Sequence, residues 1–525
     1  MILENVISFY NKKDTFKVIA FLILSLPAFQ YGSQFQNLLV SIQTPNFTCQ
    51  YNETSHQIQI SKDQCTMTIN GSNVKCQHWT FSSEPFGKTI MSDYDLVCDY
   101  KYVGDLLVLL WYSTSLMAPV FGWLADKYGR KMISIIFLSI ETVATFILAF
   151  TPNLSSHIFF RLCIGFSESA YHICYVWLME MVNKDFRNVA GSFFWLYGSV
   201  AMTVFPLTVY VTRNWRLTQL ISLTPSILYV LILFVPESPR WLCVKNKKQQ
   251  LMESLQTIAN INKMDLQLTP EEIKIEKTTK ESNKWNAFKD NNFLFLASTS
   301  LFAVFSISIL ISAILIDLNL LSSNIYISMF VLGLMEFPGA LLSYLSMYFF
   351  KRKRMITIFS MFGSIFIFLS VTLSKVDKWQ SIFRMIFGSI GKVLVITSSQ
   401  GVLVYATELF PTTHRSLFFG MLQIILLMAM TAAVYINKLN QFYGFIPMLI
   451  YFLLNMISCC LIFVFMPETK GLPIPETIFD QRLLVKEREQ EYLEYMYNRS
   501  DVVNSDREDS DASSEMSQLI NRKFR

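Results

Sequence analysis

Twelve stretches of this 525-residue chain are long and apolar enough to cross a lipid bilayer. A spanning helix needs about 20 mostly apolar residues, because the hydrocarbon core is about 30 Å thick. Charged residues make up only 16% of the chain, too few to cover a water-facing surface of this length. The pattern predicts an all-α membrane protein and excludes a soluble enzyme, a disordered scaffold and a secreted disulfide module. The predicted spans are 17–40, 103–124, 132–151, 157–178, 190–211, 217–235, 293–316, 325–349, 355–374, 380–405, 416–436 and 444–466.

Basic residues set the expected orientation, because Lys and Arg collect in the short loops that face the cytosol. They cluster at 127–131, 184–187 and 351–354, whereas the opposite loops at 152–156 and 317–324 contain none. We therefore expect both termini to be cytoplasmic, and the first span to be retained rather than cleaved as a signal peptide.

The loops between the spans divide the chain into parts. The acidic, Ser-rich composition of the last part is typical of disordered chain. The expected parts are a cytoplasmic N-terminus (1–16), an N-terminal six-helix half (17–235), a cytoplasmic helical loop (236–292), a C-terminal six-helix half (293–466) and a cytoplasmic tail (467–525).

The loop at 41–102 has the composition of an extracellular segment. An even number of cysteines together with three N-x-[ST] triplets indicates an oxidised, glycosylated loop. Four cysteines allow three pairings, and the sequence does not choose among them. The residues concerned are Cys49, Cys65, Cys76 and Cys98, and Asn46, Asn52 and Asn70.

The two halves repeat the same charged positions at the ends of corresponding spans. Two six-helix repeats joined by a long loop resemble the major facilitator superfamily, whose substrate site lies near the midplane between the halves. The matching residues are Glu180 and Arg187 with Glu408 and Arg415, and Glu237 and Arg240 with Glu468.

The segment 122–132, GWLADKYGRKM, resembles the superfamily signature G-x-L-x-D-x-x-G-R-[KR]. Gly122 and Gly129 allow a tight turn and close helix contact. Asp126 and Arg130 can engage charges and helix ends on the facing half, in contacts that break when a carrier changes state. The resemblance implies a gating role for this segment and for the repeated charged residues.

Several strings narrow the resemblance to the organic ion transporters of solute carrier family 22. They are CQHWTF (76–81), TI (89–90), DLVC (95–98), PESPRWL (236–242), EFPGA (336–340), TELFPT (407–412) and PETKGLPIPET (467–477). Membership implies a plasma-membrane carrier that transports small organic ions by alternating access, functions as a monomeric unit and needs no cofactor.

The chain departs from the family pattern in ways that leave its substrate class open. The outer loop has four cysteines where relatives usually have six, and the second copy of the gating motif (348–352) lacks its acid. In the eleventh predicted span, a position that is charged in relatives falls on Leu427. In the seventh, positions where many relatives have pocket aromatics fall on Val304 and Ile311. A Lys that is common in helix 4 falls on Glu168.

Ionisable groups inside spans are costly, and each is therefore a functional candidate. Glu168 and His172 lie four apart on one helix face, where they can pair with each other or offer charge to a cavity. Glu336 matches a cavity position of the family, and its structural alternative is a pair with Lys392. Glu141 can equally be a structural partner. The three acids within the spans outnumber the one base, Lys392. This excess of negative charge favours a cationic or zwitterionic substrate.

Aromatic residues can add cation–π contacts of about 0.5–2 kcal/mol each. Trp195 and Tyr175 fall at positions that face the pathway in relatives. With 45 Phe and 23 Tyr in the chain, the alternative for any one ring is a core or lipid-facing position.

No motif supports an enzyme. The chain lacks a G-x-x-x-x-G-K-[ST] loop, a nucleophile elbow, H-E-x-x-H and cysteine pairs at zinc spacing, and we expect no metal, cofactor or nucleic-acid partner. The leading interpretation is a carrier for organic cations or zwitterions, with the lipid bilayer as its surroundings. The alternatives are an organic anion or carnitine-like zwitterion transporter and, in another class, a non-transporting membrane sensor or binding protein.

Overall fold

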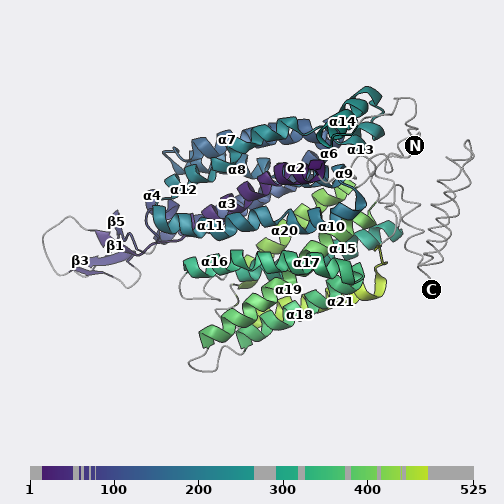
Figure 1. Ribbon diagram of the computed structural model, residues 1–525. Helices are drawn as coiled ribbons and strands as arrows, with labels where there is room; N and C mark the ends of the chain where they lie inside the picture. Colours follow the sequence, from purple (N-terminus) through teal and green to yellow (C-terminus); the bar gives the residue numbers. More distant parts are fainter. Residues whose placement is uncertain are drawn as a thin grey trace, which may run out of the picture.

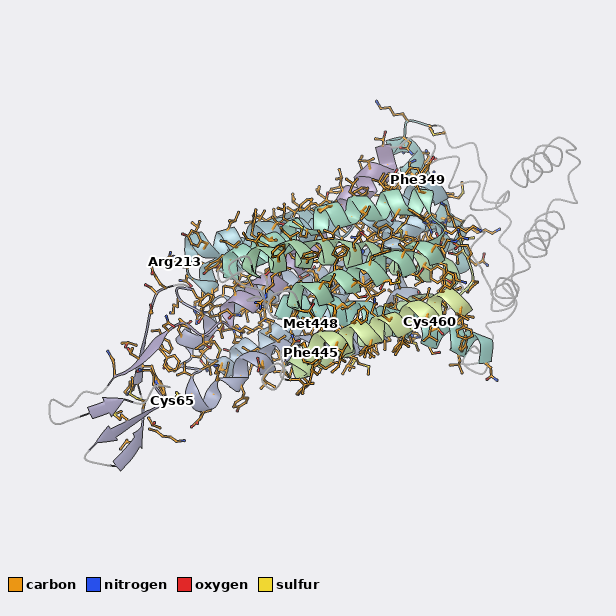
Figure 2. All side chains as sticks on the ribbon, turned by 90° about the horizontal axis from the view of Figure 1, so that it is seen from below. Cys65, Arg213, Phe349, Phe445, Met448 and Cys460 are labelled. Carbon is orange, nitrogen blue, oxygen red and sulfur yellow. A yellow bond between two sulfur atoms is a disulfide. The ribbon has the colours of Figure 1, made fainter. Side chains whose placement is uncertain are left out.

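The chain folds into a bundle of long helices with a small group of strands at one end (Figure 1). The computed structural model describes residues 15–50, 58–60, 64–69, 72–76, 78–84, 86–264, 291–316, 325–372, 380–410, 415–437, 439 and 445–470. Figure 2 shows Arg213 at the strand end of the bundle and Phe349 at the opposite end. We call the opposite end the α13 end, after a short helix that lies there.

The N-terminal half contains the helices that precede residue 235, and two short helices follow it at the α13 end. The half consists of α2 (Thr15–Leu24), α3 (Leu26–Ser41), α5 (Tyr102–Ser113), η2 (Thr114–Met117), α6 (Ala118–Tyr128), α7 (Arg130–Leu148), α8 (Leu154–Ser167), α9 (Ser169–Met181), α10 (Lys184–Phe193), α11 (Leu196–Thr212), α12 (Trp215–Ser222) and η3 (Thr224–Phe234). The short helices are α13 (Pro239–Val244) and α14 (Lys248–Ile261).

The C-terminal half packs beside it. It consists of α15 (Asn291–Ile316), α16 (Ile325–Leu334), α17 (Glu336–Phe349), α18 (Arg352–Thr372), α19 (Gln380–Leu409), α20 (Arg415–Asn437) and α21 (Ile446–Phe465). Eleven helical segments of the described chain are long and apolar enough to cross a membrane. The remaining predicted span, 157–178, is occupied by α8 and α9.

Several spans are interrupted in the middle rather than continuous. The α8–α9 junction falls at Glu168, the α10–α11 junction at Trp195 and the α16–α17 junction at Met335, directly before Glu336. Three residues proposed from the sequence as substrate contacts therefore lie at helix junctions. Discontinuous helices of this kind form the substrate and ion sites of many transporters.

The strand end is held by two disulfides, Cys49–Cys76 and Cys65–Cys98, so all four outer-loop cysteines are paired as expected (Figure 2). Strands β1 (Phe47–Gln50) and β5 (His78–Phe81) pair antiparallel, and β2 (Ile58–Ile60), β3 (Thr66–Ile69) and β4 (Ser72–Lys75) form a second antiparallel sheet. Asn46 is exposed directly before β1. Asn52 and Asn70 lie outside the described residues.

A charged clamp fastens the end of the outer loop to the N-terminal half. The Asp93 carboxylate, at the end of α4 (Ile90–Asp93), lies 2.7 Å from Lys88 Nζ and 2.9 Å from Arg216 Nε. Partial burial favours the neutral acid, but the hydrogen bonds and charges of Lys88 and Arg216 outweigh it and hold the pKa of Asp93 below its usual value. Trp215 Nε1 also donates to this carboxylate, at 3.1 Å.

The clamp makes the docking of the outer loop acid-sensitive. Because the folded-state pKa of Asp93 is depressed, the clamp stabilises docking above the unfolded pKa of about 3.9 and loses that contribution as the pH falls through the folded pKa. Asp93→Asn removes it at neutral pH, at a cost of about 1 kcal/mol after solvent screening. We expect amide hydrogen exchange across 86–94 to accelerate about fivefold.

The matched control is Asp95→Asn, since Asp95 is exposed two residues away and Asn tolerates its positive φ of 53°. Equal exchange rates in the Asp93 and Asp95 variants would show that the clamp does not hold the loop.

Candidate functional site

Arg130 ties three segments together at the α13 end of the N-terminal half. Its Nη2 donates to Asp126 Oδ1 at 2.9 Å and to Glu180 Oε1 at 3.1 Å, and its side chain is only 8% exposed. Nη1 donates to the Ala125 carbonyl oxygen. These bonds join the end of α6, the start of α7 and the end of α9.

Glu237 completes this network from the segment that follows η3. Its carboxylate accepts hydrogen bonds from the backbone N–H groups of Arg130, Lys131 and Ser238 at 3.0–3.3 Å. A Cβ on Gly129, which has φ of 119°, would collide with this carboxylate, so the turn requires glycine. Burial raises the pKa of Glu237, although the backbone donors and Arg130 oppose the increase.

The C-terminal half repeats the network with Arg352 in the place of Arg130. Arg352 Nη2 and Nε donate to the two oxygens of Glu408 at 3.0 and 3.2 Å, and Nη1 donates to the Met347 carbonyl oxygen. Glu468 accepts from the backbone N–H groups of Arg352 and Lys353, as Glu237 does from Arg130 and Lys131. Ser238 Oγ donates to Glu180, and Thr469 Oγ1 donates to Glu408 in the same manner.

Arg352 was missed as a site residue in the sequence, where only the missing acid of its motif was noted. Its position in the motif could have revealed it, because Arg352 occupies in the second copy the position that Arg130 occupies in the first. Tyr348 takes the place of Asp126. Trp241 Nε1 donates to the Asp126 carbonyl oxygen and Lys470 Nζ to that of Tyr348, so even this backbone contact recurs.

The remaining predicted gating residues lie at the same end. Gly122 is half-buried within α6, Arg187 is half-buried on α10, and Arg240 is half-buried in α13. Arg415 begins α20, and its side chain lies outside the described residues. The described contacts of Arg130 and Arg352 join segments of their own half, and the expected engagement of the facing half by the motif stays a prediction.

The two halves contact each other through small and apolar groups. At the α13 end, Ser192 Oγ on α10 approaches Met347 Sδ on α17 at 3.8 Å, and the rings of Phe193 and Tyr344 lie 5.6 Å apart. Along the bundle, a Cβ on Gly333 of α16 would collide with the backbone of Thr203 on α11. α10 and α17 therefore lie against each other at the α13 end.

A second contact joins the halves at the strand end. Tyr326, near the start of α16, packs against Phe86 of the outer loop and Tyr210 of α11, with ring centroids 6.2 and 5.5 Å apart. The outer loop therefore touches both halves, although its clamp belongs to the N-terminal half.

Glu336 and Lys392 form an ion pair within the C-terminal half. Lys392 Nζ lies 3.2 Å from Glu336 Oε1 and also donates to the Leu332 carbonyl oxygen. Lys392 is 1% exposed and the Glu336 side chain 17%. The pair is the structural alternative that the sequence left open for these two candidates.

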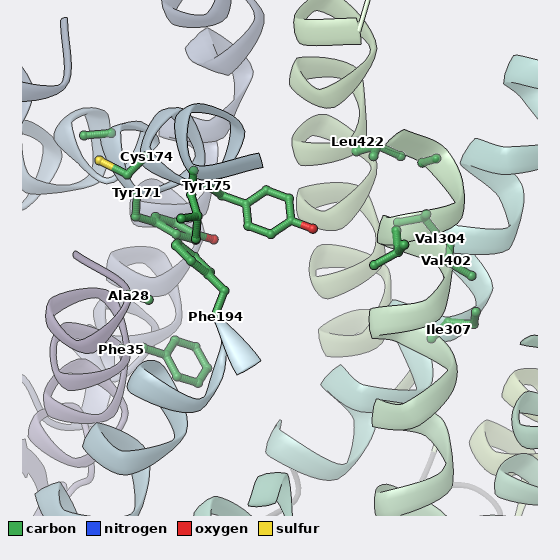
Figure 3. Packing of buried hydrophobic residues seen from close by; sticks show 14 of the residues in the cluster. Ala28, Phe35, Tyr171, Cys174, Tyr175, Phe194, Val304, Ile307, Val402 and Leu422 are labelled. Atoms are coloured by element: carbon green, nitrogen blue, oxygen red, sulfur yellow. The ribbon is translucent and has the colours of Figure 1, made fainter. Parts of the chain in front are cut away.

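Trp195 and Tyr175 come together in the N-terminal half within a cluster of rings, and Glu168 lies near Tyr31, Tyr112 and Tyr171 of the same cluster. Trp195 packs against both Tyr171 and Tyr175 with centroid distances of 5.7 Å, and Tyr31 stacks on Tyr171 at 4.5 Å. Figure 3 shows the Tyr175 hydroxyl pointing toward helices of the C-terminal half. The aromatic cluster consists of Tyr31, Phe35, Trp111, Tyr112, Tyr171, Tyr175, Phe194 and Trp195.

Buried polar atoms around this cluster lack hydrogen-bond partners in the described part of the chain. They include His172 Nε2 and Trp195 Nε1, whereas Glu168 and Trp111 lie near enough to bond each other. Glu168 and His172 are thus not joined by a hydrogen bond or ion pair through His172 Nε2. Buried polar groups are almost always paired, so these exceptions mark groups that a bound water, ion or ligand can satisfy.

Arg161 is a buried cation that was not among the site residues predicted from the sequence. It is 1% exposed, and its Nη1 donates to Gln34 Oε1 at 3.3 Å. Gln219 donates to the same oxygen at 2.9 Å, and Gln34 donates to Ser222 at 3.1 Å. This polar network ties α3, α8 and α12 together inside the N-terminal half.

A family model for sugar (and other) transporters matches residues 113–478, most of the chain. The chain belongs to this transporter family. It is therefore a carrier rather than an enzyme, and the expected absence of catalytic chemistry agrees with this membership.

Relatives of this transporter support the narrower resemblance. Solute carrier family 22 member 3 of Mus musculus is 26% identical over 407 residues, 75% of this chain and 71% of that protein. Organic cation/carnitine transporter 2 of Homo sapiens is 25% identical over 421 residues, 78% of this chain and 74% of that protein. Solute carrier family 22 member 2 of Rattus norvegicus is 25% identical over 80% of this chain and 77% of that protein. The predicted resemblance to solute carrier family 22 is confirmed.

Solved structures confirm the predicted major facilitator fold. The proton:xylose symporter XylE bound to 6-bromo-6-deoxy-D-glucose has a TM-score of 0.64 at 15% identity, covering 89% of this chain and 99% of that one. Partially occluded inward-open and inward-open conformations of the xylose transporter XylE from E. coli have TM-scores of 0.55 and 0.51.

The paired networks predict that Arg352 matters as much as Arg130. Arg352→Gln removes the charge that two Glu408 hydrogen bonds depend on, at a cost of about 1.5–3 kcal/mol. We expect the thermal unfolding temperature of the purified protein to fall by as much as in Arg130→Gln. The control is Arg354→Gln, because Arg354 is exposed two residues later in the same turn of α18. An Arg352 variant as stable as the Arg354 variant would contradict the equivalence.

Proposed function

We propose that this protein transports small organic ions across the plasma membrane by alternating access, with a preference for cations or zwitterions. One observation carries the proposal. Aromatic rings gather beside the junctions of broken helices in the N-terminal half, and the Tyr175 hydroxyl of this cluster points toward the C-terminal half. Relatives named as organic cation/carnitine transporters support the substrate class.

The proposed site takes Glu168, Tyr175 and Trp195 from the N-terminal half. Aliphatic side chains, among them Val304 and Val402, come from the opposite half (Figure 3). A substrate bound between the halves contacts both, so rocking of one half against the other exposes it to each side in turn. Glu336 and Lys392 border the α16–α17 break of the second half.

We also propose that the α13 end faces the cytosol. The basic clusters 127–131 and 351–354 lie at this end, and the disulfide-bonded strands and exposed Asn46 lie at the other. Oxidised cysteines and a glycan acceptor belong on the extracellular side. A single chain contains both halves of the proposed site, which supports a monomeric carrier unit.

A non-transporting sensor is the second candidate, because Tyr348 replaces the acid of the second gating motif. The contacts of Arg352 argue for transport, since they keep the rest of that network in place.

Uptake into proteoliposomes tests the proposed function directly. The panel contains radiolabelled organic cations, zwitterions and anions, with binding to the detergent-solubilised protein measured in parallel. Uptake of one class that saturates and is blocked by members of the same class is expected. Saturable binding without uptake would identify the sensor instead.

Asp126→Asn tests gating within the same assay. The variant loses the charge that faces Arg130 Nη2, and we expect the maximal uptake rate to fall about tenfold while substrate affinity changes little. The control is Lys127→Gln, an exposed neighbour on the same turn. Normal turnover in the Asp126 variant would remove the gating role of this residue.

A further inference from the structure

We propose that the segment 348–354, YFFKRKR, binds the headgroup of an anionic phospholipid, with Lys351 and Arg354 as its cationic contacts. The segment joins the end of α17 to the start of α18 and is the second copy of the gating motif, the copy that lacks its acid. The proposal goes beyond ion transport, because it gives this altered copy a ligand of its own.

The two copies of the motif differ in charge although their arginines sit in equivalent networks. The first copy is balanced, because its three bases lie with three acids. In the second copy Tyr348 replaces the acid, and four bases lie with two acids, which leaves an excess of positive charge. The balanced set is Lys127, Arg130 and Lys131 with Asp126, Glu180 and Glu237, and the unbalanced set is Lys351, Arg352, Lys353 and Arg354 with Glu408 and Glu468.

The two lysines of the first copy are occupied by the protein itself. Lys127 Nζ lies over the rings of Trp123 and Tyr128, 5.1 and 5.0 Å from their centroids. Lys131 Nζ donates to the Leu233 carbonyl oxygen at 2.6 Å. This end of the N-terminal half therefore offers little unmatched charge to a ligand.

The second copy presents its extra bases to the outside. Arg352 is buried on Glu408, and Lys353 Nζ lies 5.6 Å from the centroid of the Phe463 ring. Lys351 and Arg354 are exposed, and neither has an ion-pair partner among the residues that the structure describes. Two neighbouring cations are thus available to an anion at this surface.

Three consecutive aromatic rings adjoin these cations. Tyr348, Phe349 and Phe350 are 71%, 72% and 43% exposed, and Figure 2 marks Phe349 at the α13 end of the bundle. The Tyr348 and Phe349 rings lie 5.2 Å apart. Exposed aromatic residues at the end of a spanning helix are typical of the boundary between lipid and water, where the ring is apolar and the surroundings are partly wet.

Exposed apolar stripes on α17 and α18 both end at this segment. Residues four apart lie on one face of a helix, and an exposed apolar face of a spanning helix contacts acyl chains. The stripes are Leu341, Leu345 and Phe349 on α17, and Ile358 and Phe362 on the same face as Arg354 on α18. A phospholipid whose acyl chains lie along these stripes places its phosphate at the level of Lys351 and Arg354.

The chemistry of the two cations selects the headgroup. The planar guanidinium of Arg354 matches two phosphate oxygens, and Lys351 supplies a point charge beside it. Two cations favour a headgroup that carries a carboxylate as well as a phosphate, such as that of phosphatidylserine, over the zwitterionic headgroup of phosphatidylcholine. Each basic residue near an anionic lipid surface strengthens binding about fivefold. The leaflet that supplies this lipid, the cytosolic one, rests on the orientation given under the proposed function.

The acidic tail of the chain is the competing occupant. Its sequence from 505 to 515 is rich in Asp and Glu and complements the same positive charge. Three exposed rings favour lipid over this tail, because a charged, Ser-rich sequence offers no apolar surface to cover them.

Lipid binding to the full-length protein in detergent tests the proposal. The protein is titrated with phosphatidylserine or phosphatidylcholine of identical acyl chains, and bound lipids are counted by native mass spectrometry. We expect phosphatidylserine to bind more tightly. The double variant Lys351→Gln/Arg354→Gln should lower its affinity about 25-fold and leave that of phosphatidylcholine unchanged. An unfolding temperature equal to that of wild type without lipid checks that the variant is folded.

The matched control removes two charges from the first copy of the motif. In Lys127→Gln/Lys131→Gln we expect the affinity for phosphatidylserine to stay within about twofold of wild type, because these two lysines are held by the protein. Phe349→Gln should weaken the binding of both lipids, since it removes the apolar end of the α17 stripe.

Four outcomes would overturn the proposal. They are equal affinities of the wild-type protein for the two lipids, a preference for phosphatidylserine that survives in the Lys351/Arg354 variant, and displacement of the lipid by an equal concentration of soluble glycerophosphoserine. The fourth is a preference that appears only when the tail acids Asp506, Glu508, Asp509 and Asp511 are neutralised, which would identify the tail as the occupant. Binding is measured without transport, so each of these outcomes leaves the carrier intact. A wild-type protein that takes up no organic ion would instead contradict the proposed function.

Discussion

The rest of this structure depends on the hydrogen bonds and ion pairs of a buried arginine, which lies at the same end of each half. Arg130 and Arg352 each bind a carboxylate of the same half and a carbonyl oxygen five residues earlier in the chain. A buried charge is tolerated only when it is paired and hydrogen-bonded, so each arginine fixes the helix ends around it. Each half is thus fastened internally by its own arginine, and the described contacts between the halves include apolar ones.

Those contacts are the ones that a moving carrier can exchange. The described pairs between the halves at the α13 end include a serine against a methionine sulfur and an aromatic pair, Phe193 with Tyr344. Neither leaves a charge buried without a partner when it separates, which lowers the cost of opening. The strong ion pairs, by contrast, hold each half together and survive a rigid-body rotation of one half against the other.

The sequence predicted the fold well, because span length and the internal repeat follow directly from the thickness of the bilayer. It also placed Glu168, Trp195 and Glu336 among the substrate candidates, without indicating that they lie at helix junctions. For Glu336 the sequence left two alternatives, a cavity position and an ion pair with Lys392. The rotation of the two helices decides between them, and a sequence does not show that rotation. Arg161 was missed as a buried cation, because its acceptor, Gln34, is a neutral residue far away in the chain. Arg352 was missed because its copy of the motif has Tyr348 in place of the acid and so looked incomplete.

Distances between spin labels at the two ends of the bundle test the central claim most directly. Labels at Glu253 and Lys351 report the α13 end, and labels at Lys101 and Leu439 report the strand end; all four residues are exposed. Non-natural amino acids carry the labels, so that the native cysteines and both disulfides stay intact. On addition of choline or tetraethylammonium, alternating access predicts that the two distance distributions shift in opposite directions. Binding of either cation with both distributions unchanged would contradict the account.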